Sequence, residues 1–303
     1  PNPFQRLIRL ILLPLTLIYM LIILLKRLLA RPKIFNIAII SIGNLIIGGS
    51  GKTPIVIALA RRYDNVAIVL RGYKRQSKGM LVISNKNQIL QDIEKSGDEA
   101  MLLAQSLPHA TIIVSEKREE GIQKAIELGC KIVFLDDGFS KYHIAKFDIL
   151  IRPKNEPTNV LCLPSGGYRE PKMMYSMAQL ILNEEHDFKR KVSFTYHEQT
   201  IDTLPKKLLL LTAISKPQRL LEFLPQNTKM VAFEDHHHFT QKEMDDIKKQ
   251  YKDYAMITTQ KDWVKLSCLK LETPYLMDLN IEFLNDKKLE QIDNFIAKFK
   301  KSK

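Results

Sequence analysis

Short, largely apolar runs alternate with segments of helical periodicity through the middle of the chain. Such runs are typical of strands buried on both faces, and their alternation with helices predicts a parallel sheet covered by helices. The predicted strands are residues 34–42, 66–70, 111–114, 131–135 and 147–151. The predicted helices between them include residues 53–62, 98–106 and 117–128.

A second alternation follows an isolated strand predicted at residues 191–196. Its predicted strands are residues 208–212, 230–233, 255–258 and 274–279, and its predicted helices are 217–224, 241–251 and a last one at the C-terminus. The pattern predicts an α/β protein with two domains. We expect an α/β/α domain at 34–190, a β linker at 191–206 and a smaller α/β domain at 207–303.

The N-terminal segment 1–33 has a different pattern. Residues 10–25 are apolar apart from Thr16 and Tyr19, and basic residues bracket them on both sides. A helix of this length spans about 24 Å, less than the roughly 30 Å hydrocarbon core, but residues 7–29 reach across if the flanking basic side chains snorkel. The segment after it lacks a small-residue signal-peptidase site. We expect a membrane-associated helix kinked at Pro14, with a buried core helix as the alternative, and whether it spans or embeds stays open.

The turn between the first predicted strand and helix reads Gly43-Asn-Leu-Ile-Ile-Gly-Gly-Ser-Gly-Lys-Thr-Pro54. Glycine-rich backbone lets several N–H groups point at one anion, the helix N-terminus adds its positive dipole end, and Lys52 reaches the outer phosphates of a nucleotide. Thr53 offers a hydroxyl to Mg²⁺. The strict pattern has glycine where this chain has Ile46, so an ordinary glycine turn is the alternative.

Composition narrows the class of partner. With 303 residues, 45% hydrophobic and 26% charged, the chain is globular rather than disordered. The net charge of +13 implies attraction to a phosphate-rich partner, which is nucleic acid, an anionic membrane or a phosphorylated substrate. The three cysteines are far apart and have no paired spacing. Neither a disulfide framework nor a zinc site is expected, and a reducing compartment fits best.

Acidic residues follow two predicted elements. Asp136 and Asp137 end an apolar strand, which brings carboxylates to the carboxyl edge of a parallel sheet, where ligands bind. A carboxylate there can hold Mg²⁺ against the terminal phosphates of a nucleotide. Asp98 opens a predicted helix, where it is either an N-cap or a catalytic carboxylate.

Three histidines, residues 236–238, follow a later strand. Adjacent histidines face different directions, so a three-histidine metal cluster is not expected. One imidazole paired with a carboxylate would instead make a base that can deprotonate a hydroxyl, and a solvated histidine run is the alternative. Loops after strands also carry cations that can bind phosphate, at residues 71–75, 117–118 and 169.

Together these segments resemble one family closely, tetraacyldisaccharide 4′-kinase, the lipid A kinase of Gram-negative bacteria. The similarity runs from the apolar helix almost to the C-terminus, and the family's loop likewise lacks the first glycine. The motifs occur in order as Gly43-Asn44, Gly48-Gly-Ser-Gly-Lys-Thr-Pro54, Arg71-Gly-Tyr73, Gly97-Asp98-Glu99, Lys117-Arg118, Leu135-Asp-Asp-Gly138, Leu163-Pro164, Arg169-Glu-Pro171, Asp235-His-His237 with Phe239, and Thr259-Gln-Lys-Asp262.

The resemblance implies transfer of the γ-phosphoryl group of ATP, with Mg²⁺, to the 4′-hydroxyl of a tetraacylated glucosamine disaccharide 1-phosphate, giving lipid IVA. It implies a P-loop kinase-like domain and a smaller α/β domain with the active site between them. The implied catalytic pair is Asp98 with His236, or with His237 instead. The implied nucleotide ligands are Gly48, Gly49, Ser50, Gly51, Lys52, Thr53, Arg118 and Arg169. The implied metal ligands are Thr53, Asp136, Asp137 and Glu170, and the substrate contacts are Asn44, Arg71, Tyr73 and His237.

The family also implies a place in the cell. We expect the bacterial inner membrane, with the catalytic body on the cytoplasmic side where ATP is available, and a lipid partner rather than nucleic acid. The chain departs from the family pattern at Ser140-Lys141, where the family has Gln-His, and is one residue shorter before Asp148. We assign Ser140 no role.

Two other classes of function share part of the pattern. A membrane-associated GTPase or ATPase of another function would have the same phosphate loop, but a GTPase needs a guanine-selecting Asn-Lys-x-Asp segment, which residues 85–88 and 260–262 do not match. A nucleic-acid binder would explain the charge and leave the loop and the apolar helix without a role. The kinase is therefore the preferred hypothesis.

Overall fold

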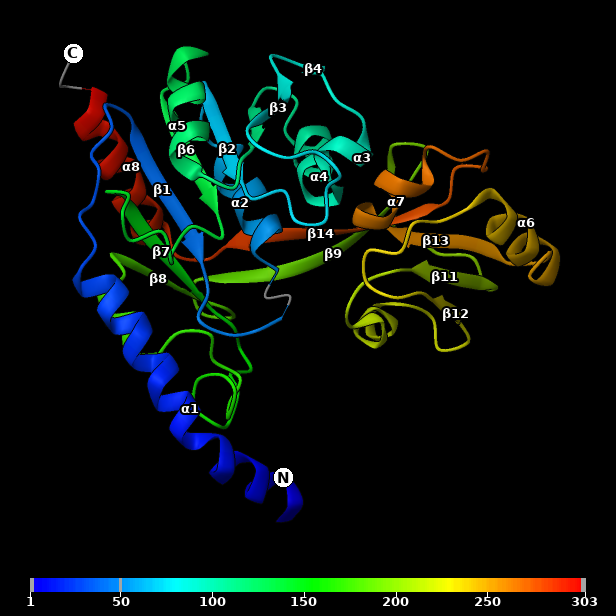
Figure 1. Cartoon of the computed structure of the whole chain (residues 1–303). Coiled ribbons are helices and arrows are strands. Elements are labelled where there is room, and N and C mark those ends of the chain that lie inside the picture. Colours follow the sequence, from blue (N-terminus) through cyan, green and yellow to red (C-terminus); the bar gives the residue numbers. More distant parts are fainter. Residues whose placement is uncertain (1–2, 49–50, 301–303) are drawn as a thin grey trace.

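The computed structural model describes residues 3–48 and 51–300, and it contains two sheets that lie side by side (Figure 1). Within these residues the first sheet has eight strands in the order β4-β3-β5-β2-β6-β1-β7-β8. The strands from β5 to β8 run parallel, and β3 and β4 add an antiparallel edge. Their bounds are β1 Ala38–Gly43, β2 Val66–Leu70, β3 Leu81–Asn85, β4 Gln88–Ile89, β5 Thr111–Val114, β6 Ile132–Asp136, β7 Phe147–Arg152 and β8 Leu180–Asn183.

Helices cover both faces of this sheet, which is why its central strands are apolar throughout. On one face of the sheet, Ile40 of β1 shares a core with residues of α2, α4 and α8. On the opposite face, Ile39 of β1 shares a core with residues of α5. The helices are α2 Lys52–Ala60, α3 Ile93–Ser96, α4 Asp98–Ser106, α5 Arg118–Glu127 and α8 Asp286–Lys300. All these parallel strands end at one edge, so the loops after β1, β2, β5 and β6 gather there.

The second sheet has the order β10-β9-β14-β13-β11-β12. β14, β13, β11 and β12 are parallel, whereas β9 and β10 are antiparallel to their neighbours. The helices α6 and α7 pack on one face, and the 3₁₀ helix η2 packs on the other. The bounds are β9 Phe188–Tyr196, β10 Gln199–Ile201, β11 Leu208–Thr212, η2 Pro217–Phe223, β12 Lys229–Ala232, α6 Gln241–Gln250, β13 Ala255–Thr259, α7 Gln260–Leu266 and β14 Tyr275–Phe283.

The paired strands β9 and β14 join the two units as a long ribbon, drawn in green and red in Figure 1. Phe188 and Phe283 at one end pack in the first core, and Phe194 and Tyr275 at the other end pack in the second. After β14, the helix α8 returns to the first sheet. Strong pairing along the whole ribbon therefore ties the two units to one scaffold.

The predicted α/β class, the second smaller α/β unit and the apolar N-terminal helix are confirmed. Two local expectations were wrong. The strand at 191–196 is not isolated, because β9 begins at Phe188 and pairs with β14 along its length. The first sheet is mixed rather than wholly parallel. The helix expected at 217–224 is present as the 3₁₀ helix η2. The domain boundaries stay a prediction, since β9 and α8 each contact the first unit.

The N-terminal helix α1, Pro3–Leu28, contains Pro14 and lies along the outside of the first unit (Figure 1). It is the one helix of the described residues that is long and apolar enough to cross a membrane, over 23 residues from Arg6 to Leu28. One side contacts the segment 162–178 and β7 through partly buried side chains such as Tyr19 and Ile23. Its other side leaves many leucines and isoleucines exposed.

Candidate functional site

The turn between β1 and α2 holds a geometry that glycine makes possible. Gly48 and Gly51 have φ angles of +97° and +59°, in the left-handed region that disfavours other residues. A Cβ on Gly51 would also lie 2.2 Å from the Arg190 guanidinium. Gly51 provides no side-chain cap for α2, so the first N–H groups of that helix are available to an anion. Gly49 and Ser50 lie outside the described residues.

Four side chains beside this turn form what we call the loop cluster, namely Asn44, Lys52, Asp137 and Arg169. Lys52 Nζ lies 3.0 Å from Asn44 Oδ1 and 3.5 Å from Asp137 Oδ1. The Arg169 guanidinium holds both oxygens of Asp137, donating through Nη1 at 2.9 Å to Oδ2 and through Nη2 to Oδ1. It also donates to Asn44 through Nε and Nη2. The cluster thus places two cations and one carboxylate at the mouth of the glycine turn.

The two adjacent acids at the end of β6 have opposite electrostatics. Burial acts to raise the pKa of Asp137, but hydrogen bonds from Arg169 and the charge of Lys52 outweigh it and lower the pKa to about 2. Burial, reinforced by nearby Glu99, raises the pKa of Asp136 to about 7. The Asp136 Oδ1 atom is buried and accepts no hydrogen bond within residues 3–48 and 51–300. Of these two acids, Asp136 is therefore the one with a buried oxygen that accepts no hydrogen bond from the described residues.

Other predicted nucleotide and metal residues lie near these acids. Glu170 is buried and accepts a hydrogen bond from the Tyr142 hydroxyl at 2.6 Å, and burial raises its pKa. Arg118 at the start of α5 is also buried, and burial lowers its pKa to about 10 against the attraction of Asp136 and Asp137. Thr53 is in the first turn of α2. These positions bring the predicted set to one edge of the first sheet.

A second group of side chains meets where the two units touch. We call Asp98, His236, Asp262 and Lys265 the interface cluster. Asp98 is the first residue of α4, and its Oδ2 lies 3.1 Å from His236 Nδ1 and 3.5 Å from Lys265 Nζ. Lys265 Nζ also lies 3.3 Å from Asp262 Oδ1. Asp98 comes from the first unit, and the other three members of the cluster come from the second.

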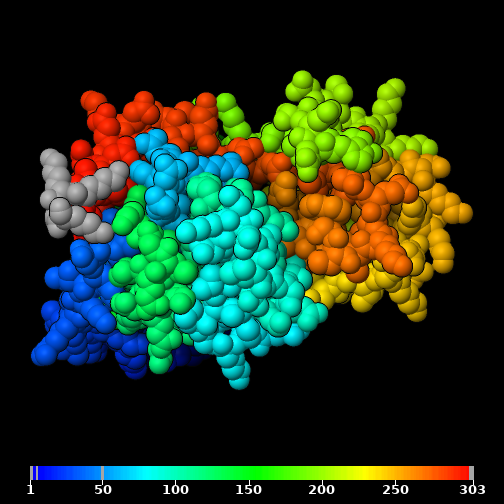
Figure 2. Space-filling view, turned by 90° about the horizontal axis from the view of Figure 1, so that it is seen from above, coloured from blue at the N-terminus to red at the C-terminus, as the bar shows by residue number. Residues whose placement is uncertain are grey.

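Local backbone explains how these side chains are presented. Gly97 has a φ of +80°, and it lets the chain turn from α3 directly into α4 so that Asp98 begins the helix. His236 has a φ of +69° in the turn after β12. The helices α4 and α7 are in contact, and the view from above shows the cyan α3–α4 segment directly against the orange α7 segment (Figure 2). That contact brings Asp98 and Lys265 together.

The structure separates the two histidines that the sequence left as alternatives. His236 contacts Asp98, and the Tyr73 ring lies edge-on to it at 5.8 Å between centroids. His237 turns away, stacks on Phe233 at 4.4 Å and lies 3.1 Å from Glu243 Oε1 in the capping box of α6. The roles of both histidines stay predictions, and the geometry favours His236 as the partner of Asp98.

The remaining predicted substrate contacts fall in different surroundings. Asn44 is fully buried, and its side-chain oxygen is taken by Lys52 and Arg169. Arg71 is exposed in the loop after β2. Its positive charge contributes to lowering the pKa of Arg118 and of Lys141. Lys141 is one of the two residues at which the chain departs from the family pattern. Of the predicted substrate residues, Tyr73 contacts the Asp98–His236 pair through its ring, which lies against the His236 imidazole.

Sequence reasoning missed two basic residues at these clusters. Lys265 follows Asp262 by one helical turn, and that i, i+3 spacing was its only signal. Arg190 lies on β9, donates to the Gly51 carbonyl oxygen at 3.1 Å and pairs with Glu184 at 2.6 Å. Nothing in the sequence places residue 190 beside residue 51, because their contact depends on the ribbon's position.

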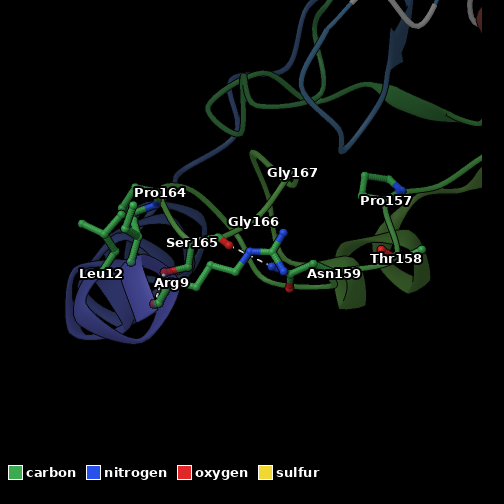
Figure 3. A pocket seen from close by; sticks show the side chains of 10 residues that line it. Arg9, Leu12, Pro157, Thr158, Asn159, Pro164, Ser165, Gly166 and Gly167 are labelled. Atoms are coloured by element: carbon green, nitrogen blue, oxygen red, sulfur yellow. Dashed lines mark hydrogen bonds between the residues drawn. The ribbon is translucent and has the colours of Figure 1, made fainter. Parts of the chain in front are cut away.

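A separate pocket of about 460 Å³ lies between α1 and the segment 157–167. Arg9 extends from the helix toward Asn159 and the glycine pair at 166–167 (Figure 3). Ser165 closes one side by donating to the Arg9 carbonyl oxygen and accepting from Thr16. None of the predicted catalytic or nucleotide residues lines this pocket, so it belongs to the contact between α1 and the body.

Comparisons with known proteins cover nearly the whole chain. A family model described as tetraacyldisaccharide-1-P 4′-kinase matches residues 8–297. The chain is 57% identical over 300 residues to a tetraacyldisaccharide 4′-kinase of Aliarcobacter butzleri, covering 99% of this chain and 95% of that protein. It is 42% identical over 299 residues to one of Campylobacter jejuni, covering 99% and 94%.

A solved structure is also similar. It is the "apo" form of LpxK from Aquifex aeolicus in complex with ATP, with a TM-score of 0.78 and 27% identity over 95% of this chain and 99% of that chain. Together with the family model, this match spans both sheets and most of α1. The order of motifs therefore belongs to a full-length relationship and not to an isolated phosphate loop.

Proposed function

The chain belongs to the tetraacyldisaccharide-1-P 4′-kinase family, and we propose that it carries out the family reaction through the two clusters described above. The reaction is phosphorylation of the 4′-hydroxyl of tetraacyldisaccharide 1-phosphate in lipid A biosynthesis. A bond forms between the 4′-oxygen and the γ-phosphorus of ATP, the bond to the β–γ bridging oxygen breaks, and ADP leaves. The hydroxyl proton must pass to a group on the enzyme.

ATP as donor is supported by the glycine turn and by the relative that is a complex with ATP. The uncapped N-terminus of α2 can take up phosphate oxygens, and Lys52 and Arg169 supply positive charge beside it. Asp137 holds both cations in place before the nucleotide arrives. We propose that these cations exchange part of their contact with Asp137 for contact with the phosphates.

Asp136 is the residue that best fits Mg²⁺. Its Oδ1 is buried without a hydrogen-bond partner in the described part of the chain, and a hard cation prefers carboxylate oxygen. The described residues hold no group of three metal-ligating side chains, which agrees with Mg²⁺ sites that take one or two carboxylates and complete their shell with phosphate and water. Thr53, Asp137 and Glu170 are further candidates. When bound, Mg²⁺ neutralises charge on the phosphates.

The observation that carries the proposal is the contact between Asp98 and His236 across the two units. An ionised Asp98 holds the imidazole with its proton on Nδ1, because a carboxylate accepts that hydrogen bond. The other ring nitrogen is then free of a proton. We propose that this pair accepts the proton of the 4′-hydroxyl as the phosphoryl group is transferred.

Membrane association through α1 accounts for its exposed apolar face. We propose that α1 embeds in the cytoplasmic leaflet of the bacterial inner membrane and does not cross it. Contacts with the body run from the Arg9 carbonyl oxygen to the Arg27 guanidinium, a length of about 27 Å along the helix. A helix held against the body over that length cannot cross the bilayer unless the body enters it as well. Embedding would hold the membrane surface near the loop cluster, because Tyr19 of α1 donates to the Arg169 carbonyl oxygen.

The decisive experiment is transfer of labelled phosphate. We expect the purified full chain in detergent, with Mg²⁺ and ATP labelled at the γ position, to label tetraacyldisaccharide 1-phosphate but not the same lipid lacking its 4′-hydroxyl. Asp98→Ala should lose turnover and keep ATP binding. Absence of label on the lipid would overturn the proposal, and equal use of GTP would favour a nucleotidase of another function.

A further inference from the structure

Lys265 is a buried cation that the proposed reaction does not yet use. Its side chain is 4% exposed, and its Nζ makes no hydrogen bond within the described ranges 3–48 and 51–300. Burying an ammonium group is costly unless opposite charge compensates it. The compensation comes from Asp98 at 3.5 Å and Asp262 at 3.3 Å, with the Phe239 ring at 5.1 Å on another side.

Asp262 is fixed by contacts other than Lys265. Its Oδ2 accepts from the hydroxyls of Thr212 at 2.7 Å and Thr259 at 2.9 Å, and from the Ala213 N–H at 3.2 Å. The other oxygen of Asp262, Oδ1, is left for the Lys265 ammonium group. Asp262 therefore anchors Lys265 inside the second unit, and the charge of Lys265 faces Asp98 of the first unit.

The charged groups that face Asp98 come from the second unit. Burial acts to raise the pKa of Asp98, but the hydrogen bond from His236, the charge of Lys265 and the smaller effect of Lys261 outweigh it and lower the pKa. Lys261 itself pairs with Asp235 at 3.3 Å, and Asp235 Oδ1 lies 3.8 Å from His236 Nε2. Lys265 is the most buried of the lysines around this carboxylate.

We propose that Lys265 is a positioning residue for the proton-accepting pair. Its ammonium group holds Asp98 ionised and turned toward His236, so the pair is complete only when α7 of the second unit lies against α4 of the first. This inference rests on the proposed function, because it assigns Lys265 to the same transfer step. Lys265 acts through Asp98, and its ion pairs are with Asp98 and Asp262 rather than with the described residues of the glycine turn.

The test compares pH–rate profiles of the full chain in detergent. We expect Lys265→Met to move the acid limb of kcat toward higher pH by roughly 1 to 3 pH units, since it removes an opposite charge close to Asp98. The direction follows from the charge: without the cation, protonation of Asp98 becomes easier, so activity is lost at a higher pH. The KM for ATP should change less than about 3-fold, because the loop cluster is separate. Lys265→Arg, which keeps the charge, should keep the limb near its wild-type position.

Lys288→Met is the matched control. Lys288 pairs with buried Asp187 at 2.6 Å on the first unit, so its loss disturbs a comparable ion pair away from the interface cluster. It should lower the melting temperature and leave the acid limb in place. If Lys265→Met lowers kcat equally at every pH, like a general loss of stability, Lys265 is structural and the proposal is overturned.

A measurement on the wild-type protein decides the matter if Lys265→Met does not fold. Carbon-13 titration of the Asp98 carboxyl group should show ionisation below the ordinary aspartate range. An Asp98 pKa above the ordinary range would overturn the proposal. Failure of the wild-type chain to phosphorylate the lipid would instead sink the proposed function, so the two failures are distinguishable.

Discussion

The loop cluster and the interface cluster are built in different ways. Asn44, Lys52, Asp137 and Arg169 all belong to the first unit, and two of them, Asn44 and Asp137, directly follow β1 and β6. The interface cluster joins Asp98 to side chains from the second unit. The first cluster therefore needs only its own sheet edge, whereas the second exists only while the two units are in contact.

This difference predicts which step each cluster controls. A preformed cluster of cations at a helix N-terminus can bind a nucleotide whether or not the units are closed. If Asp98 and His236 accept the proton as proposed, a pair divided between two units is complete only in one arrangement, which limits catalysis to that arrangement. Variants of the loop cluster should mainly change the KM for ATP, and variants of the interface cluster should mainly change kcat.

The largest expected effect comes from separating the two histidines. His236→Ala should lower kcat by roughly 10² to 10⁴, the usual range for loss of a general base, with little change in the KM for ATP. His237→Ala removes the contact with Glu243 and the stack on Phe233, so it should lower the melting temperature and cost far less turnover. Steady-state kinetics of both variants check this, and a larger loss from His237→Ala would reverse the assignment.

Lys52→Ala should have the next largest effect, and it should act mainly on the affinity for ATP. It removes a charge-assisted contact to phosphate that is worth about 1.5 to 3 kcal/mol, which corresponds to roughly 10-fold to 150-fold weaker ATP binding. Turnover should fall as well, because the same cation stabilises the transferred group. Calorimetric titration with ATP measures the binding loss. A variant with wild-type affinity would separate Lys52 from the nucleotide.

Two members of the loop cluster, Lys52 and Asp137, lie in short motifs beside strand ends, whereas the family resemblance implied the role of Arg169. The carboxyl edge of a parallel sheet collects such ends, so Lys52 and Asp137 could be expected near one another before the structure. Lys265 and Arg190 could not, because their contacts join α7 to α4 and β9 to the glycine turn. Contacts of that kind depend on how the ribbon orients the two units, and no local pattern encodes it.

The missed elements differ in their causes. β8 has four residues, and it was missed because a short apolar run has no periodicity of its own. β9 was predicted as an isolated strand because its partner β14 comes some 80 residues later in the chain. The helix α7 begins inside the motif Thr259-Gln-Lys-Asp262, where Asp262 donates its N–H to the Thr259 hydroxyl as in a helix N-cap. This N-cap signal at Thr259 is local, so the sequence alone could have predicted the start of α7.

A smaller effect tests the electrostatics within the loop region. The folded-state pKa of Asp136 is raised to about 7, so its contribution to stability is present below the unfolded pKa and is lost as pH rises through 7. Asp136→Asn should therefore stabilise the nucleotide-free protein at pH 8, by on the order of 1 to 2 kcal/mol, and the gain should shrink as pH falls toward 4. Thermal melts across this range measure it.

Asp137→Asn is the matched control with the opposite sign. The pKa of Asp137 is lowered to about 2, so its stabilising contribution is present above the unfolded pKa and is lost as pH falls through 2. This variant should destabilise the protein at pH 8, because Arg169 and Lys52 lose their carboxylate. Equal shifts of the melting temperature in both variants would contradict the assignment of opposite environments to these neighbours.

The smallest expected effect tests the connection between α1 and the loop cluster, to which the interface cluster should be indifferent. The Tyr19 hydroxyl on α1 donates at 2.8 Å to the carbonyl oxygen of Arg169, whose side chain holds Asp137. Tyr19→Phe removes that hydrogen bond, worth about 1 kcal/mol, and leaves the ring in its contact with the body. Because only the loop cluster is touched, the KM for ATP should rise by less than about 5-fold while the acid limb of kcat keeps its position. A shift of the acid limb instead would mean that α1 acts on the interface cluster, and the separation between the two clusters would then fail.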